Sequence, residues 1–265
     1  MKPDCLLIRV GEQALKSKQV QKRFNKILLN NINSVIKDRI EKGHNRIFIY
    51  TKNIKKTENI LKRIFGITSF SPAYVCDSNL NDIKKLSLKI AKKFKFKTFA
   101  IRVRRSGKHI FNSQRIAEEV GDVIRKKLKV KVNLSKPDKE IFIECKSKKT
   151  YIFTKKIIGP GGFPLGTAGR VFGIIENKQD IVAAWLIMKK GCELTLNKNS
   201  RILKKWHIGR KLKIQKNNNG IQSVVIGENH KKQLFDRLYK SNLLVLRPLV
   251  GFNNAKIEEI YQKIA

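Results

Sequence analysis

The chain has 265 residues, and 59 Lys and Arg against 20 Asp and Glu give it a formal net charge of +39. The cations are interleaved with apolar residues along the whole chain, and a hydrophobic fraction of 41% can build cores, which excludes a merely basic tail. Lys-rich composition of the thermophile kind is one explanation, but Glu normally rises with Lys there. The excess charge therefore predicts a polyanionic partner, in first place a nucleic acid.

The four cysteines stand far apart, without the paired spacing of zinc or redox motifs. We expect free thiols, no metal site and an intracellular, reducing environment, the cytoplasm. The apolar run at residues 6–10 is too short for a signal peptide or a membrane span.

The first 75 residues predict a strand-helix-strand-helix unit from apolar runs and helical periodicity. The expected ranges are a strand at 4–10, a helix at 19–40, a strand at 46–50 and a helix at 57–65. Gly66 is placed to cap the second helix.

A second unit is expected to begin near Asp77, in the order helix, strand, helix, hairpin. Its predicted elements are helices at 80–94 and 112–128, a strand at 98–104, and hairpin strands at 140–146 and 150–157.

The Gly- and Pro-rich segment at residues 159–169 predicts an irregular connector. After it, strands alternate with helices, which predicts a small parallel sheet of the α/β class. The expected strands are 171–175, 223–227 and 243–246, and the expected helices are 181–190, 230–240 and 256–264.

Basic residues cluster where the strand at 98–104 runs into the following helix. Arg102 and Arg104 share one face of the strand, and Arg105, Lys108 and His109 follow it. Because the amides at a helix start attract anions, the cluster predicts a phosphate site. The alternative is a solvated strand edge that guards against aggregation.

Two further features stay open from the residues alone. The connector's glycines leave amides accessible to a ligand, but a plain interdomain linker would have the same composition. Trp206, in a basic stretch, is either a platform for a stacked base or a buried core residue. None of the four histidines has a partner at a spacing that suggests catalysis.

Several blocks resemble, in collinear order, the 4-thiouridine tRNA synthetases, also called tRNA sulfurtransferases. They are VGEQALKSKQVQKRF near the N-terminus, residues 99–121, GPGGFPLGT, VAAWLIMKKGCE, and VLRPLVGFNNAKIEEIYQKI near the end. The resemblance implies a ferredoxin-like domain at 1–75, a THUMP domain at 76–166, and a truncated, degenerate, Rossmann-like PP-loop domain of the adenine nucleotide alpha hydrolase type at 167–265.

Members of that family grip tRNA with the first two domains and adenylate uridine eight with the third. The resemblance, together with the basic clusters, nominates a set of RNA-contacting residues. The set is Lys16, Lys18, Lys22, Arg23, Arg102, Arg104, Arg105, Lys108, His109, Gly161, Gly162 and Thr167. Shape and phosphate readout would suffice for a folded RNA.

One family motif is missing. Before VAAW the family carries an SGGxDSP loop that wraps the pyrophosphate of ATP, and here residues 175–181 read IENKQDI. Both glycines are lost, and Glu176 would bring a carboxylate toward the phosphates, a repulsion of about 4 kcal/mol at ~4 Å. A rhodanese domain and a persulfide-carrying cysteine are also not expected.

The sequence therefore predicts a tRNA-binding protein without catalysis or cofactor, an accessory to a separate modifying enzyme or an active paralogue. A homodimer is plausible by the same resemblance. One alternative is an active sulfurtransferase that binds ATP and magnesium in an atypical loop and uses an external sulfur donor. Another is a general RNA- or ribosome-associated basic factor.

Overall fold

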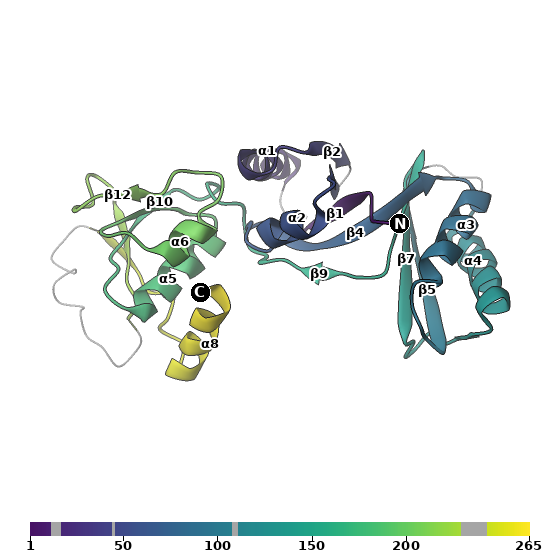
Figure 1. The fold of residues 1–265 in the computed structure, drawn as a ribbon. Helices are drawn as coiled ribbons and strands as arrows, with labels where there is room; N and C mark the ends of the chain where they lie inside the picture. The colour runs from purple at the N-terminus through teal and green to yellow at the C-terminus, as the bar shows by residue number, and fades with distance from the viewer. Residues whose placement is uncertain (12–16, 44–45, 108–110, 229–242) are drawn as a thin grey trace. The chain divides into compact units, whose positions relative to one another are not determined.

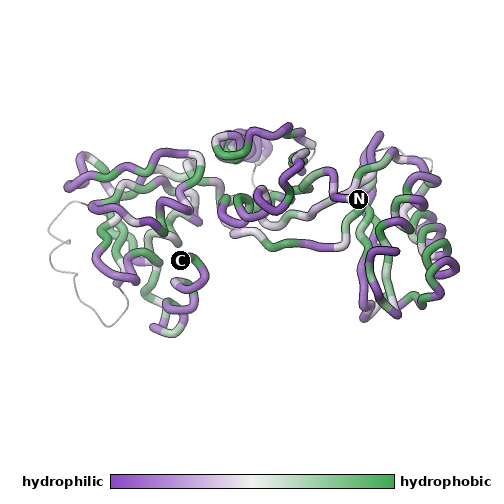
Figure 2. The backbone as a smooth tube through the Cα atoms, in the orientation of Figure 1, coloured by the Kyte–Doolittle hydropathy of each residue, from purple (hydrophilic) through white to green (hydrophobic). Residues whose placement is uncertain are grey.

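The computed structural model describes residues 1–11, 17–43, 46–107, 111–228 and 243–265 (Figure 1). The chain divides into two compact units. The first contains residues 1–8, 38–55 and 70–157, and the second contains residues 9–37, 56–69 and 158–265. Hydrophobic and hydrophilic residues alternate along both (Figure 2), as expected for folded units with charged surfaces.

A mixed sheet of nine strands has the order β2-β3-β1-β4-β8-β7-β5-β6, with β9 paired to β4. Its strands are β1 (Cys5–Val10), β2 (Arg39–Gly43), β3 (Arg46–Tyr50), β4 (Ile67–Asp77), β5 (Thr98–Arg105), β6 (Lys131–Val132), β7 (Lys139–Cys145), β8 (Lys149–Phe153) and β9 (Ile157–Ile158). The helices of this part of the chain are α1 (Lys18–Val35), α2 (Ile54–Leu61), α3 (Leu80–Ala91) and α4 (Ser113–Leu128).

Strand β7 shows how the first unit builds two cores from one sheet. Ile141, Ile143 and Cys145 join the core under α3 and α4, whereas Phe142 belongs to the cluster on the opposite face. On that face Phe48 of β3 stacks on Tyr151 of β8, with ring centroids 4.3 Å apart. Since β1 and β4 lie between these strands in the sheet, the sheet must curl strongly to bring the two rings together.

The second unit contains a sheet of five strands, all parallel, in the order β12-β11-β10-β13-β14. Its elements are β10 (Arg170–Gly173), α5 (Lys178–Lys189), β11 (Glu193–Leu196), α6 (Arg201–Trp206), β12 (Lys213–Ile214), β13 (Ser223–Val225), β14 (Leu244–Leu246) and α8 (Asn254–Ile264). Numbered by chain position the order is 3-2-1-4-5, the doubly wound arrangement, which confirms the predicted parallel sheet.

An aromatic cluster links the segment after α2 to the core of this sheet domain. Phe65 is 2% exposed and belongs to the same core as Trp185 and Trp206. Its ring stacks on Trp206 at 5.5 Å between centroids and lies 5.6 Å from Trp185. Trp206 is buried and donates its indole N–H to Ile264 O at 2.9 Å, so the core interpretation of this tryptophan is confirmed.

The connector, residues 159–169, is a tightly packed turn region. Gly161 and Gly162 have φ values of +67° and +71°, which only glycine adopts without strain. A Cβ on Gly162 would collide with Lys189 O at the end of α5. Phe163 packs edge-on against Phe24 of α1, at 5.6 Å between centroids. The connector is therefore fastened to both α1 and α5.

Several predicted boundaries were wrong. The first helix ends at Val35, because Ile36 is already extended and residues 39–43 pair with β3, so the predicted helix over 19–40 is too long. Helix α2 begins and ends a few residues before the expected 57–65, and Gly66 follows it in a turn. The second hairpin strand stops at Phe153, since residues 157–158 pair with β4. Strands β2, β4, β6, β11 and β12 and helix α6 were not predicted.

The predicted helix start at Asn112 is confirmed to within one residue: α4 begins at Ser113, and Asn112 caps it by accepting from Arg115 N at 2.7 Å. The predicted helix over 230–240 lies outside the described residues. None of the helices in the described ranges combines the length and apolarity that a membrane span requires.

Replacing Phe65 by Ala should lower the free energy of unfolding by about 3–5 kcal/mol, because the ring fills a core between two tryptophans. Thermal and denaturant unfolding would measure the loss. The matched control is Phe94→Ala, whose ring is 39% exposed and whose loss should stay near 1 kcal/mol or below. Equal losses for the two variants would contradict the packing described for Phe65.

Candidate functional site

The carboxyl edge of the five-stranded sheet has its switch point between β10 and β13, where strand order reverses. Doubly wound sheets bind ligands in the crevice at this point. The loop after β10, residues 174–177, and the loop after β13, residues 226–228, meet there. The family that the sequence resembles carries its SGGxDSP loop at this position, where this chain has residues 175–181.

Asp180 and Asn177 accept hydrogen bonds from backbone amides around the start of α5. The Asp180 carboxylate accepts from Glu176 N at 2.9 Å and from Asn177 N at 3.0 Å through Oδ2. Its Oδ1 accepts from Gly227 N at 2.8 Å, across the switch point. Asn177 caps α5 in turn and accepts from Gln179 N at 2.8 Å. A tethered carboxylate therefore occupies the amide-lined position at the start of α5.

The neighbouring loops are closed around this carboxylate. A Cβ on Gly227 would collide with Asp180 N, so β13's loop abuts the helix start. Asn197, after β11, accepts from Ile175 N at 2.8 Å, and buried Glu228 pairs with Arg247 at 3.3 Å. Glu176, which the sequence placed near the phosphates, has an exposed side chain, and the carboxylate that meets the amides belongs to Asp180.

The basic cluster at the end of β5 lies where the sequence placed it, but its members differ in role. Arg102 is held by Glu140 at 2.8 Å and by Leu134 O at 2.6 Å. Arg105 donates to Phe111 O at 2.8 Å, just before α4, and Arg104 is exposed. Lys108 and His109 lie outside the described residues.

The turn between β7 and β8 adds cations that sequence reasoning missed. A Cβ on Gly107 would meet Ser147 of that turn, so the segment after β5 touches the turn between β7 and β8. Because Arg105 pairs with Cys145 in the sheet, Lys146 and Lys148 follow at the same end of the sheet as Arg104 and Arg105. Burial, together with nearby Arg46, lowers the pKa of Lys146. We call Arg104, Arg105, Lys146 and Lys148 the β5 cluster.

The remaining predicted RNA contacts lie in α1 and the connector. Lys18 and Lys22 are exposed on α1, and Arg23 donates to Thr167 O at 3.3 Å. The Thr167 hydroxyl donates to Pro164 O at 2.8 Å. Gly161 and Gly162 serve the turn geometry described above, and Lys16 lies outside the described residues.

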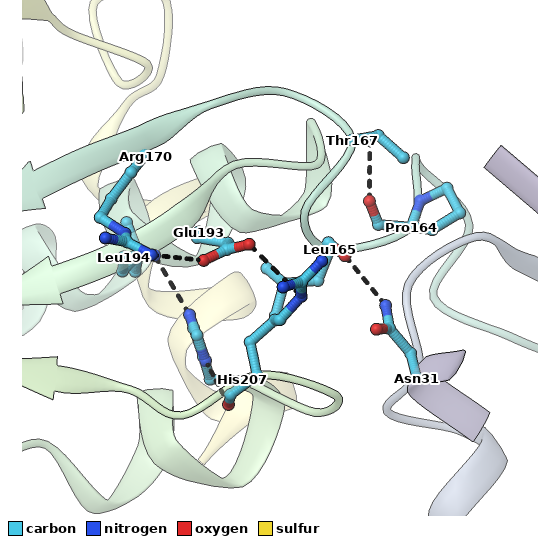
Figure 3. A network of polar contacts seen from close by, with 9 residues as sticks. Asn31, Pro164, Leu165, Thr167, Arg170, Glu193, Leu194 and His207 are labelled. Carbon is cyan, nitrogen blue, oxygen red and sulfur yellow. Dashed lines mark hydrogen bonds and ion pairs between the residues drawn. The ribbon is translucent and has the colours of Figure 1, made fainter. Parts of the chain in front are cut away.

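A polar network fastens α1 and the connector to the sheet domain (Figure 3). Asn31 of α1 donates to Leu165 O at 2.9 Å. At the amino ends of β10 and β11, Glu193 pairs with Arg170 at 3.0 Å and with Arg210 at 3.4 Å. The bond between Asn31 and Leu165 joins segments that are 134 residues apart.

Buried His207 completes the network as a neutral imidazole. Its Nε2 accepts from Leu194 N at 3.1 Å, so Nδ1 carries the proton and donates to Arg210 O at 3.0 Å. Burial lowers the pKa of His207, against the raising effects of Arg210 O and Glu193.

The thiols are all unpaired and poorly ionised. Burial raises the pKa of Cys5 and of Cys76 to about 12 and also raises the pKa values of Cys145 and Cys192. Within the described ranges, no three His, Cys, Asp or Glu side chains converge in a way that could hold a metal ion.

The chain thus combines a mixed nine-stranded α+β part with a doubly wound α/β domain, which makes it a multidomain protein with both kinds of fold. Comparison with known families assigns the modules: the ThiI ferredoxin-like domain matches residues 5–71, and the THUMP domain matches residues 77–155.

Known relatives give the same assignment. The chain is 37% identical to the probable tRNA sulfurtransferase of Methanobrevibacter smithii, over 73% of this chain and 53% of that protein. It is 30% identical to the probable tRNA sulfurtransferase of Saccharolobus islandicus strain M.16.27, over 96% of this chain and 84% of that protein. The chain belongs to the tRNA sulfurtransferase family. It spans about half the length of several relatives it matches.

Two solved structures share the architecture. PH1313 from Pyrococcus horikoshii Ot3 superposes with a TM-score of 0.85 and 28% identity, covering 98% of this chain and 99% of that chain. A 4-thiouridine synthetase solved in complex with RNA and with bound ATP superposes with a TM-score of 0.83 at 22% identity, covering 100% of this chain and 85% of that chain. The ferredoxin-like and THUMP domains and the third, parallel-sheet domain are thus those of the family.

Replacing Asp180 by Ala should lower the free energy of unfolding by about 2–4 kcal/mol, since three amides lose their acceptor and the helix cap is broken. Chemical denaturation would measure the difference. Glu176→Ala, four residues earlier and exposed, should change stability by less than about 0.5 kcal/mol. Similar values for both variants would show that Asp180 does not hold the loop.

Stability should fall as pH drops below about 6.5, the ordinary pKa of a histidine in the unfolded chain. There the unfolded chain takes up a proton that native His207 resists, because its folded pKa is lowered. In His207→Gln the melting temperature should depend less on pH between 5 and 6.5. Parallel melting curves against pH for the two proteins would contradict this assignment.

Proposed function

We propose that this chain is a tRNA-binding member of its family that does not adenylate RNA and that presents tRNA to a separate modifying enzyme or an active paralogue. The observation that carries the proposal is the Asp180 carboxylate, which accepts hydrogen bonds from the amides of Glu176, Asn177 and Gly227. ATP phosphates would have to compete with this tethered anion for the same donors. The residues of the loop therefore do not fit ATP, and no step of adenylation is assigned to them.

The chemistry of the thiols supports the same proposal. Sulfur transfer through a cysteine requires a thiolate, and the raised pKa values of all four cysteines disfavour that form. His207 is buried, and both of its ring nitrogens are hydrogen-bonded; the other three histidines lie outside the described residues.

The RNA-binding half of the proposal rests on charge and family. A net charge of +39 is carried by a chain with a THUMP domain, and the related 4-thiouridine synthetase was solved with RNA. Arg105 of the β5 cluster bonds to Phe111 O just before the start of α4, where phosphates are favoured, and Arg104 and Lys148 are exposed at the same end of the sheet. Folded tRNA is the proposed ligand, and the cytoplasm the proposed location.

The competing function is an active sulfurtransferase, which the names of the relatives favour. Calorimetry with ATP and magnesium, in the presence and absence of tRNA, separates the two. We expect no saturable heat, and mass analysis of tRNA incubated with ATP and a sulfide donor should reveal no thiolated nucleoside. Micromolar ATP binding or a thiolated product would establish the enzyme instead.

RNA binding should weaken steeply with salt, each neutralised phosphate adding about 0.9 to the slope of log K against log salt. Arg104→Ala combined with Lys148→Ala should reduce this slope by about 1–2. The control, Lys126→Ala with Lys127→Ala, removes the same charge at the opposite end of α4, about 20 Å away along the helix. If both pairs behave alike, or a single strand binds as well as folded tRNA, a general basic factor is the better description.

A further inference from the structure

We infer that the third domain itself grips RNA, through a composite basic surface made jointly by α1 and the amino edge of the five-stranded sheet, which binds an RNA phosphate backbone. Its residues are Lys18, Lys22, Arg23 and Lys26 on α1, Arg170 at the start of β10, and Arg210 after α6. This inference rests on the proposed RNA binding and adds a site at the opposite edge of the sheet from the loop of Asp180.

Helix α1 is electrostatically unusual. Its 18 residues contain no Asp or Glu, and four cations lie in its first half. The amino end of a helix carries partial positive charge, so cations placed there cost stability and acidic residues are the rule. Lys18, Lys22 and Lys26 are exposed and follow one another at i, i+4 spacing, about 6 Å apart along the axis. A row of phosphate groups along the helix would offset the repulsion among these cations.

The structure fixes the third domain's arginines beside this helix. Gly209, with φ of +98°, abuts α1 so closely that a Cβ would collide with Asn31 Oδ1. Arg210 is the next residue. On the other flank, Arg23 donates to Thr167 O, three residues before Arg170. Arg210 is therefore placed by the close packing of Gly209 on α1, and Arg170 by its nearness in the chain to Thr167, which is bonded to Arg23 of α1.

Glu193 orients the two arginines without covering them. One carboxylate oxygen binds Arg170 at 3.0 Å and the other binds Arg210 at 3.4 Å. Glu193 is 15% exposed, whereas the arginine side chains are 43% and 48% exposed. A guanidinium has five N–H donors in a fixed fork, so each arginine keeps donors for a phosphate while Glu193 holds its orientation.

The length and the charge of the surface indicate which ligand it binds. The cations of α1 alone lie within nine residues, from Lys18 to Lys26, or about 12 Å along the helix axis, more than a single phosphate covers. One acidic side chain against six basic ones leaves a large positive excess at the surface. A duplex stem, read through its backbone, matches both the length and the charge.

The test measures binding of labelled tRNA over a salt series. Arg170→Ala with Arg210→Ala should lower the slope of log K against log salt by about 1–2. The control is Lys178→Ala with Lys256→Ala, which removes two cations that also face glutamates, Lys178 at the start of α5 and Lys256 in α8. The control should keep the wild-type slope. An unchanged slope in the arginine pair, or an equal change in the control, would overturn the inference.

Loss of Glu193's partners could unfold the arginine variant, so Lys22→Ala with Lys26→Ala, both on the exposed face of α1, provides a second measurement with the same expected decrease in slope. Failure of the underlying proposal looks different: the wild-type protein would then bind tRNA without salt dependence or not at all.

Discussion

The proposed role of the third domain depends on the Asp180 carboxylate. An anion at the start of α5, in the crevice of a doubly wound sheet, is what this architecture stabilises. In this chain the anion is part of the chain itself, bonded to Glu176 N, Asn177 N and Gly227 N. Because it is tethered, it competes for these donors without the entropy loss that a free nucleotide suffers on binding. In the proposed account the fold is kept, and Asp180 takes the position of the ligand.

The same domain is also a structural partner of the ferredoxin-like module. Phe65 enters its core between Trp185 and Trp206, and Asn31 bonds to the connector. Removing the domain would expose those surfaces. Under the proposed function, a domain without its chemistry would still be retained for packing, and the inferred basic surface around α1 would give it a further role in holding RNA.

Much of the fold was predictable because its periodic signals are strong and local. The start of α4 at Asn112, strand β3 and the parallel sheet followed from capping, alternation and strand-helix order. Strand β4 was missed because Thr68, Ser69, Ser71 and Pro72 interrupt its apolar pattern. Its pairing with β8, far along the chain, is a tertiary effect that no local window contains.

The candidate sites were likewise predictable only where their signals are local in the sequence. The altered loop was visible in the sequence, as was the cluster of Arg104 and Arg105. The part played by Asp180 was not, since its partner Gly227 lies 47 residues away. Lys148 and Arg210 reach their clusters only through a hairpin turn and through the contact of Gly209 with Asn31. Spacing along the chain carries no signal for such neighbours.

Amide hydrogen exchange at Glu176, Asn177 and Gly227 is the most direct measurement of the central claim. We expect these three amides to be protected in the free protein and their exchange to be unchanged by millimolar ATP and magnesium. Fast exchange in the free protein that slows with a micromolar ATP midpoint would show that Asp180 yields its place to the nucleotide, and would contradict a non-adenylating role.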